Sequence, residues 1–289
     1  MDNIFKARAS KAGLLLVGAS YWTSEDQEKL DACIEKYEKA LAAKRGTKGV
    51  EADIAKLNAK KEAGFQLGKT GLGYVREQWL KDKYQYKQEV KTDVLKKGHI
   101  NEQDGIQLAD ELMPFDYTLR LKCNESKEDE YFKGTCDIDL PDDDAVEDIK
   151  SRFELSSFQS DKLEQLYVDQ LNVYGRLYGR KTLRLWSTLT DTPAHILERL
   201  DKGLMYSFGG PEVLEDNKVI EAQFLEARAQ LIHNHTPSKW LPAEDRAKVW
   251  EFKRDDERLE LLIKAVKAAR VVYDQMTLAD PDLQPWKSK

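Results

Sequence analysis

The spacing of apolar residues changes along the chain, and the first regular stretch begins near Ser24. In "TSEDQEKLDACIEKYEKALAAK" apolar side chains recur at steps of three and four, at Leu30, Cys33, Ile34, Tyr37 and Leu41. This is the period of one helix face, with Thr23 or Ser24 as its N-cap. "RGTKG" interrupts the pattern, and a weaker one follows in "VEADIAKLNAKKEAG". We therefore predict a charged helical hairpin over residues 24–62, an insertion used for packing or assembly.

The middle of the chain alternates with a period of two, which is typical of strands. "DYTLRLKCNE" predicts a first strand, with its leucines on one face, and "EYFKGTCDIDL" and "AVEDIKSRF" predict a second and a third. A helix is expected to begin near Asn101, before these strands. A further helix in "SDKLEQLYVDQLNVYGRLYG" and a fourth strand in "KTLRLWSTLT" follow them. This order predicts an α/β (α+β) fold with a small mixed central sheet flanked by helices.

The rest of the chain reads as mostly helical after Pro193. Alternation around "AKVWEF" could make one further strand, and "DDERLELLIKAVKAARVVYDQM" predicts a long amphipathic helix. We expect a single domain over residues 1–289, with its core at 98–192 and a mostly helical C-terminal extension at 211–289.

Charge is distributed unevenly around a net value of −6. Residues 1–100 hold 20 Lys and Arg against 14 Asp and Glu, whereas residues 101–150 hold 5 against 16. A basic part beside an acidic part fits a phosphate-binding surface around a metal-binding carboxylate cluster. Charge blocks are also typical of solvated faces, so this observation alone does not decide.

The cysteines and the N-terminal segment predict where in the cell the protein is found. Three cysteines without CxxC spacing indicate reduced thiols, and they are too few for a four-cysteine iron–sulfur cluster or zinc site. The apolar run near the N-terminus is too short to span a membrane and lacks the layout of a secretion signal. We expect a cytoplasmic protein with no membrane partner.

The chemistry of the acidic stretch depends on Asp148 and Lys150, which a strand would place on one face. If the second and third strands pair through "LPDDDAV", Asp137 converges on them, and Asp142–Asp144 form the turn. Two carboxylates and a backbone carbonyl are hard oxygen ligands for Mg²⁺ or Mn²⁺. A lysine on the same face can hold or deprotonate a water that attacks a phosphodiester. The alternative is an acidic hairpin with one incidental lysine, since D-x-K occurs often by chance.

The motifs "GTCDIDL" and "AVEDIKS" resemble the core of the PD-(D/E)XK nuclease superfamily, in its RecB-like and phage lambda-exonuclease-like branches. Gln170 and Tyr174 match the Q-x-x-x-Y motif of these nucleases on the helix that follows. Glu102 lies on the helix before the sheet, where they place another metal-proximal acid or a histidine, so His99 competes with it. The matches span about residues 98–192.

The resemblance implies a restriction-endonuclease-like core and a Mg²⁺-dependent deoxyribonuclease, with Mn²⁺ possible and no iron–sulfur cluster. Asp137, Asp148 and Glu102 would bind the metal with the Ile149 carbonyl, and Lys150 would position the water. Gln170 would orient the site or touch the DNA backbone, with Tyr174 as its support.

The resemblance also implies a substrate and partners. It favours an exonuclease that resects duplex DNA ends in phage-type recombination, with a homo-oligomeric ring and a single-strand annealing protein as partners. An endonuclease of the same superfamily and a non-cleaving DNA-binding or assembly protein on a nuclease scaffold are the alternatives.

Several other residues carry weaker expectations. Ser10 in "RAS" resembles a T-A-S stretch in which a serine helps to hold the phosphate of the DNA end. Asp139 is either a supporting partner of the site or a surface acid, and the role of Glu147 is open. His233 and His235 read as part of a surface loop.

Overall fold

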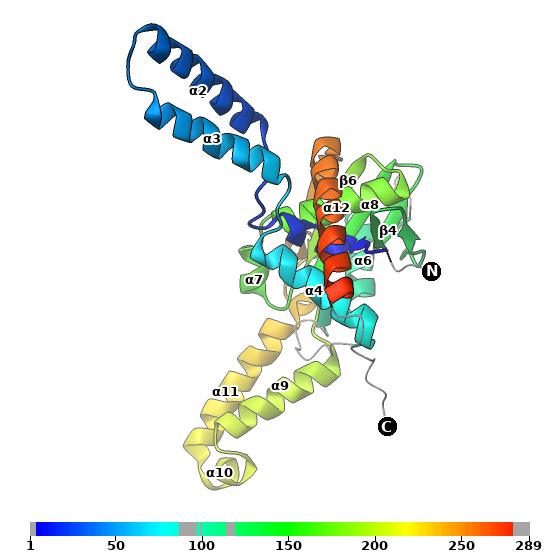
Figure 1. Cartoon of the computed structure of the whole chain (residues 1–289). Helices are drawn as coiled ribbons and strands as arrows, with labels where there is room; N and C mark the ends of the chain where they lie inside the picture. Colours follow the sequence, from blue (N-terminus) through cyan, green and yellow to red (C-terminus); the bar gives the residue numbers. More distant parts are fainter. Residues whose placement is uncertain (1–3, 87–96, 99, 114–118, 280–289) are drawn as a thin grey trace. The chain divides into compact units, whose positions relative to one another are not determined.

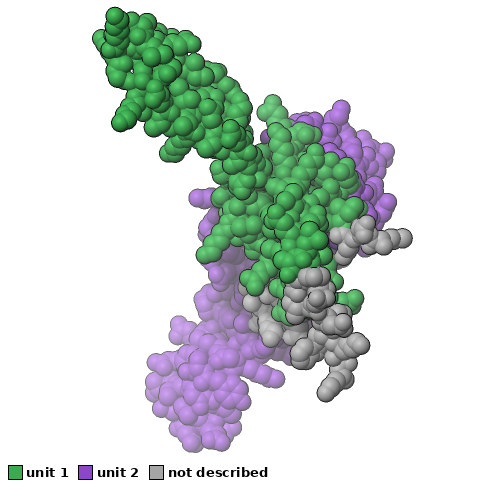
Figure 2. Space-filling model, viewed as in Figure 1, with its two compact units in different colours: residues 1–87, 130–132, 257–289 green, residues 88–129, 133–256 purple. Residues whose placement is uncertain are grey.

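The computed structural model describes residues 4–86, 97–98, 100–113 and 119–279. Contacts divide the chain into two compact units, which Figure 2 shows in different colours. The first comprises Met1–Lys87, Glu130–Phe132 and Glu257–Lys289, and the second comprises Gln88–Asp129 and Lys133–Asp256. The predicted core at 98–192 falls in the second unit apart from the short segment 130–132. No helix in these described ranges is long and apolar enough to cross a membrane.

The first unit is helical, with elements β1 (Ala7–Arg8), α1 (Ala9–Ala12), η1 (Gly13–Leu16), α2 (Ser24–Ala42), α3 (Lys48–Ala63), α4 (Lys69–Tyr84) and most of α12 (Asp256–Ala279). Aromatic packing joins its ends, because the Phe5 ring lies 5.9 Å from that of Tyr74 in α4 and 5.7 Å from that of Tyr273 in α12. Burial of these three rings gives the unit its own apolar core.

Helices α2 and α3 run side by side as a hairpin within this unit (Figure 1). Thr23 is the N-cap of α2 and forms a capping box with Asp26. The Lys60 ammonium in α3 lies 2.6 Å from the same Asp26 carboxylate and lowers its pKa to about 2. The two helices expected from the apolar spacing in residues 24–62 are therefore present.

The second unit is built on a four-stranded sheet in the order β4 (Ile138–Leu140), β5 (Ala145–Ser151), β6 (Thr182–Thr188) and β7 (Ala247–Lys253). β4 and β7 pair antiparallel with their neighbours, and β5 pairs parallel with β6 from Ala145↔Thr182 to Ser151↔Thr188. The sheet is therefore mixed, as predicted, and the strand suggested by "AKVWEF" completes it beyond residue 192.

Helices α7 (Leu155–Gln159) and α8 (Gln165–Tyr178) connect β5 to β6. They form the crossover that two adjacent parallel strands require. α8 covers one face of the sheet, and α6 (Glu102–Glu111), capped at Asn101, covers the other. Alternate residues of β5 thus face different helices. Under α6 lies an apolar cluster that includes Ile106, Ile149 and Trp186.

The second unit also holds β2 (Lys127–Glu128), which pairs antiparallel with β3 (Phe132–Gly134), a strand whose first residue belongs to the first unit. A helical arm follows, made of α9 (Ala194–Ser207), α10 (Pro211–Asp216) and α11 (Lys218–His235). The short helices η2 (Pro237–Lys239) and η3 (Ala243–Arg246) lead into β7. The histidines of "HNH" end α11, so the expected surface loop is wrong. His233 stacks on Trp240, and His235 is buried with Nδ1 3.0 Å from the Thr192 hydroxyl.

The prediction of a first strand in "DYTLRLKCNE" is wrong for the described part, which begins at Leu119. This part forms a single β-bridge, at Lys122, and its two leucines, Leu119 and Leu121, are 62% and 67% exposed. Arg120 points inward instead and pairs with the buried carboxylate of Glu147. The alternation is real, but its buried side is an ion pair rather than apolar packing.

The second predicted strand, "EYFKGTCDIDL", is divided into β3 and β4 by residues that belong to neither strand. Asp137 is the last of these residues and directly precedes β4. Because Asp137 lies in this break, its side chain is not bound to the alternating directions of a regular strand.

Gly105 allows α6 to approach the sheet, which leads to a stability prediction. A Cβ at this position would lie 2.7 Å from Ile149 Cγ2 and 2.9 Å from Thr188 Oγ1. Gly105→Ala is therefore expected to lower the free energy of unfolding by about 1–3 kcal/mol through overpacking. Gly203→Ala in α9 is the matched control, since its Cβ would meet nothing within 4 Å, and it should be neutral or slightly stabilising. Equal urea midpoints for the two variants would contradict the close approach.

Candidate functional site

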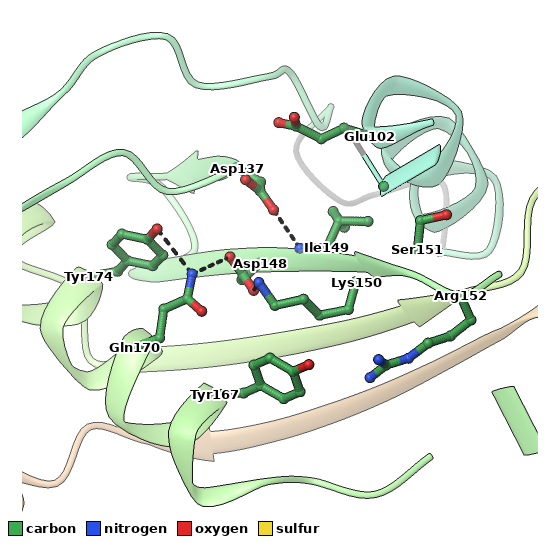
Figure 3. A pocket seen from close by; sticks show the side chains of 11 residues that line it. Glu102, Asp137, Asp148, Ile149, Lys150, Ser151, Arg152, Tyr167, Gln170 and Tyr174 are labelled. Atoms are coloured by element: carbon green, nitrogen blue, oxygen red, sulfur yellow. Dashed lines mark hydrogen bonds and ion pairs between the residues drawn. The ribbon is translucent and has the colours of Figure 1, made fainter. Parts of the chain in front are cut away.

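A pocket of about 400 Å³ lies over the middle of β5 in the second unit (Figure 3). Its lining brings together seven residues that the sequence nominated: Glu102, Asp137, Asp148, Ile149, Lys150, Gln170 and Tyr174. They come from α6, the segment before β4, β5 and α8. The fold therefore gathers the predicted site residues, while their catalytic roles stay predictions.

β5 supplies the central pair, Asp148 and Lys150, on the face that α8 covers. The Lys150 ammonium lies 2.5 Å from Asp148 Oδ2, and the Asp148 side chain is only 2% exposed. Within the described part of the chain, the Lys150 ammonium is the partner of Asp148 Oδ2 in this ion pair. A carboxylate oxygen has more than one lone pair, so Asp148 Oδ2 retains acceptor capacity beside the ammonium.

Asp137 reaches the pair through the turn between β4 and β5. Ile138 is opposite Glu147 in this antiparallel pair, so Asp137 falls beside the centre of β5. Its Oδ2 accepts a hydrogen bond of 2.7 Å from the Ile149 N–H. Pro141–Asp144 form the turn, as predicted for the acidic triplet, with Asp144 in the left-handed region at φ 50°.

α8 supplies a hydrogen-bonded support for Asp148. Gln170 Nε2 donates to Asp148 Oδ1 at 3.0 Å and to the Tyr174 hydroxyl at 3.1 Å. Because Gln170 and Tyr174 are four residues apart, they lie one above the other on the same helix face. Burial and the charge of Asp148 raise the pKa of Tyr174, which keeps its phenol neutral.

Glu102 lies at the start of α6 and lines the opposite side of the pocket. Its Oε2 is 3.1 Å from the Lys122 ammonium. The charge of Glu102 contributes to raising the pKa of Asp137, while its own carboxylate is paired with Lys122. His99, its competitor, lies outside the described residues.

The electrostatics of the pocket are those of two crowded carboxylates and one cation. Burial, and then the charge of Asp148, raise the pKa of Asp137 well above its usual value, although the Ile149 N–H and Lys150 oppose the shift. Burial lowers the pKa of Lys150, but Asp148 and Asp137 outweigh it, and the net shift is upward. Lys150 is therefore an ammonium at neutral pH.

Asp137→Asn is expected to stabilise the metal-free protein at alkaline pH. The pKa of Asp137 is higher in the folded protein than in the unfolded chain, so folding favours the protonated carboxyl. The stability that this group contributes is therefore fully present below its unfolded-state pKa, and it is lost as the pH rises through its folded-state pKa. The amide still accepts from Ile149 but carries no charge. We expect a gain of about 1 kcal/mol or more at pH 8 in EDTA, shrinking toward pH 4, since one pKa unit is worth about 1.4 kcal/mol.

The measurement is urea unfolding of wild type and variant at both pH values. Asp139→Asn is the control, because Asp139 is paired with Arg180 at 2.7 Å and its amide should stabilise at neither pH. Equal stability of the wild type and Asp137→Asn at pH 8 would show that the carboxylates of Asp137 and Asp148 do not destabilise the fold by repulsion.

The pocket has further lining residues that the sequence reasoning missed, namely Gly98, Ser151, Arg152 and Tyr167. Arg152 is bidentate to Asp161 at 2.7 and 2.6 Å. The Tyr167 ring lies 5.2 Å from the Lys150 ammonium and 5.8 Å from the Arg152 guanidinium carbon. Arg152 and Tyr167 could have been predicted from the sequence. Arg152 extends the alternation of Asp148 and Lys150, and Tyr167 precedes Gln170 by one helical turn.

Three other nominated residues are not among those that line the pocket. Ser10 is exposed in α1 of the first unit. Asp139 does not line the pocket and forms its ion pair with Arg180. Glu147 faces away from Asp148 and is fully buried among Arg120, Arg184 and Trp186, so it is a structural acid.

The donors at the pocket fit a divalent cation of the Mg²⁺ type. Among the residues that the structure describes, no group of three or more His, Cys, Asp and Glu side chains is arranged to hold a metal. Mg²⁺ does not require such a group, because it keeps several waters and is usually bound by one or two carboxylates together with substrate phosphates. A cation between Asp137 and Asp148 would offset the repulsion between their carboxylates.

Comparison with known proteins adds a likeness of fold. No family model and no curated protein matches the sequence. A phage related exonuclease from Haemophilus somnus 129PT has a similar structure, with a TM-score of 0.65, 19% identity and 96% of each chain covered. The alkaline exonuclease LHK-Exo from Laribacter hongkongensis gives a TM-score of 0.50, 11% identity, and coverage of 95% of this chain and 90% of that one. The mixed α/β fold implied by the resemblance is confirmed.

Proposed function

We propose that the protein is a metal-dependent deoxyribonuclease that hydrolyses phosphodiesters at the pocket over β5. The observation that carries this proposal is the convergence of two carboxylates, Asp137 and Asp148, with the Lys150 ammonium in one pocket. A binding module needs no buried conflict of carboxylates. Hydrolysis of a phosphodiester needs a cation site, an oriented water and a positive group near the phosphate.

The cation would be held by Asp137 and Asp148, with Glu102 at the edge and the Ile149 carbonyl as a further oxygen donor. When bound, Mg²⁺ or Mn²⁺ supplies Lewis-acid polarisation of the phosphate and lowers the pKa of water.

Lys150 serves as an orienting cation. As an ammonium it donates hydrogen bonds and accepts no proton, so it can hold the attacking water and stabilise negative charge that develops on the phosphate. Its place is fixed by Asp148 on one side and by the Tyr167 ring on the other.

Gln170 acts through Asp148 rather than on the substrate. Its amide fixes one carboxylate oxygen of Asp148 and leaves Oδ2 to the Lys150 ammonium. Tyr174 holds the same amide in its orientation. Both are positioning residues in this proposal.

We further propose that the enzyme is an exonuclease acting on duplex DNA ends, as in phage-type recombination. The two proteins of similar fold are exonucleases, and the sequence motifs resemble the same group. Assembly into a ring and cooperation with a single-strand annealing protein stay predictions from that resemblance.

Linear and closed circular duplex DNA of one sequence test the mode of action. With Mg²⁺ or Mn²⁺ the linear form should be degraded and the closed circle should persist. Cleavage of the closed circle at a similar rate would favour an endonuclease. Binding without cleavage of either form would favour the non-cleaving alternative.

A further inference from the structure

Cys123 and Cys136 lie together beside the pocket, although thirteen positions separate them in the sequence. Lys122 forms an antiparallel bridge with Ile138, and the Cys123 N–H donates to the Asp137 carbonyl at 2.7 Å. Cys123 is thus opposite Asp137, and Cys136 directly precedes Asp137 in the chain.

Both cysteines lie next to the Tyr178 hydroxyl, Cys123 with its thiol and Cys136 with its backbone N–H. Cys123 Sγ is 3.8 Å from the Tyr178 hydroxyl, and the Cys136 N–H donates to that hydroxyl at 3.4 Å. Burial, and then the neighbouring Cys123, raise the pKa of the Cys136 thiol, in keeping with two thiols that lie near each other. Successive residues of a regular strand would face opposite sides, but Cys136 lies in the break between β3 and β4 and escapes this rule.

The separation suits a covalent link. Opposite residues in an antiparallel pair have Cα atoms about 4.5–5.5 Å apart, and a strand rises ~3.4 Å per residue. In a regular pair, residues offset by one position in this way have Cα atoms roughly 6 Å apart, inside the range of about 4.4–6.8 Å that a disulfide spans.

We propose that Cys123 and Cys136 form a reversible disulfide under hydroperoxide stress, and that this bond switches off the pocket. Cys123 is half-buried and Cys136 is only 1% exposed, so Cys123 meets the oxidant first. Its thiol and hydrogen peroxide give a sulfenic acid and one water. The Cys136 thiol then attacks the sulfenic sulfur, a second water leaves, and the S–S bond forms. A dithiol reductant reverses the step.

The bond would act on the site through the chain neighbours of the two cysteines. Lys122, which holds Glu102, precedes Cys123, and Asp137 follows Cys136. A shift of about 1 Å in catalytic groups can cost two orders of magnitude in rate. Oxidation is therefore expected to lower DNA cleavage at least about tenfold, and reductant should restore it. This effect on cleavage rests on the proposed function, whereas formation of the bond does not.

Peptide mapping of the full chain tests the bond without any activity assay. The protein is treated with hydrogen peroxide, free thiols are alkylated, and unreduced peptides are analysed by mass spectrometry. We expect one linked peptide pair that joins Cys123 to Cys136, lighter by two hydrogens than the two peptides together, while Cys33 is alkylated. Full alkylation of both cysteines, or overoxidation of Cys123 without a link, would overturn the proposal.

Variants connect the bond to the pocket. Cys123→Ser should be insensitive to peroxide in cleavage and should form no link, and Cys33→Ser should behave like the wild type in both respects. Peroxide inactivation of Cys123→Ser equal to that of wild type would show that the bond does not switch the pocket. If no form cleaves DNA, the proposed function fails, and the linked peptide still decides whether the disulfide forms.

Discussion

Replacing Lys150 by methionine is expected to lower the turnover number for DNA cleavage by roughly a thousandfold, the range found when a positioned charge or proton-handling group is removed. Methionine keeps most of the length of the side chain but loses the ammonium that faces Asp148 at 2.5 Å. The water and the phosphate would then lose their orienting cation. Steady-state cleavage of a labelled linear duplex gives kcat and KM separately, and the loss should fall on kcat.

A second readout separates this role from a defect in cation binding. Without Lys150 one positive charge is gone from beside Asp137 and Asp148, so Mn²⁺ meets less repulsion there and should bind no more weakly than to wild type. Lys202→Met removes an exposed lysine of α9 and is the control for loss of one charge. Turnover by Lys150→Met at the level of Lys202→Met would exclude a catalytic role for this lysine.

Glu147→Ala is expected to lower the free energy of unfolding by about 3–5 kcal/mol, the cost of breaking a buried ion pair. Glu147 is fully buried and accepts from Arg120 at 2.7 and 2.9 Å, from Arg184 at 3.0 Å and from Trp186 at 3.0 Å. Its removal leaves the buried side chain of Arg120 without this carboxylate. Chemical denaturation monitored by circular dichroism measures the effect.

Glu251→Ala is the matched control for Glu147. It also removes a carboxylate that pairs with Arg184, at 2.7 Å, but Glu251 is 54% exposed. Exposed pairs contribute about 1 kcal/mol or less. Similar losses from the two variants would mean that burial does not set the cost of this network.

The fold could be predicted where the chain shows its period plainly. α6, β5, α8 and β6 arise from apolar residues at helical or strand spacing, and the capping box at Thr23 marks the start of α2. The segment around Arg120 could not be read in this way. Its alternation is the same whether leucines or an arginine point inward, and only the distant partner Glu147 decides which side is buried.

The gathering of the site was predictable from spacing along β5 and α8. Asp148 and Lys150 share a strand face, and Gln170 and Tyr174 share a helix face. Two neighbouring acids, Glu147 and Asp148, differ completely in environment because a strand turns them to opposite sides. The contact between Cys123 and Cys136 could not be predicted, because it depends on a break between β3 and β4 that the alternation does not show.

Cleavage of a labelled linear DNA duplex by wild type and Asp148→Asn, each with Mg²⁺ or with EDTA, tests the central claim most directly. The account predicts release of label only by the wild type with Mg²⁺, because the asparagine keeps the shape of Asp148 and its contact with Gln170 but loses the charge that holds a cation. Undiminished cleavage by Asp148→Asn, or none by wild type with either Mg²⁺ or Mn²⁺, would contradict it.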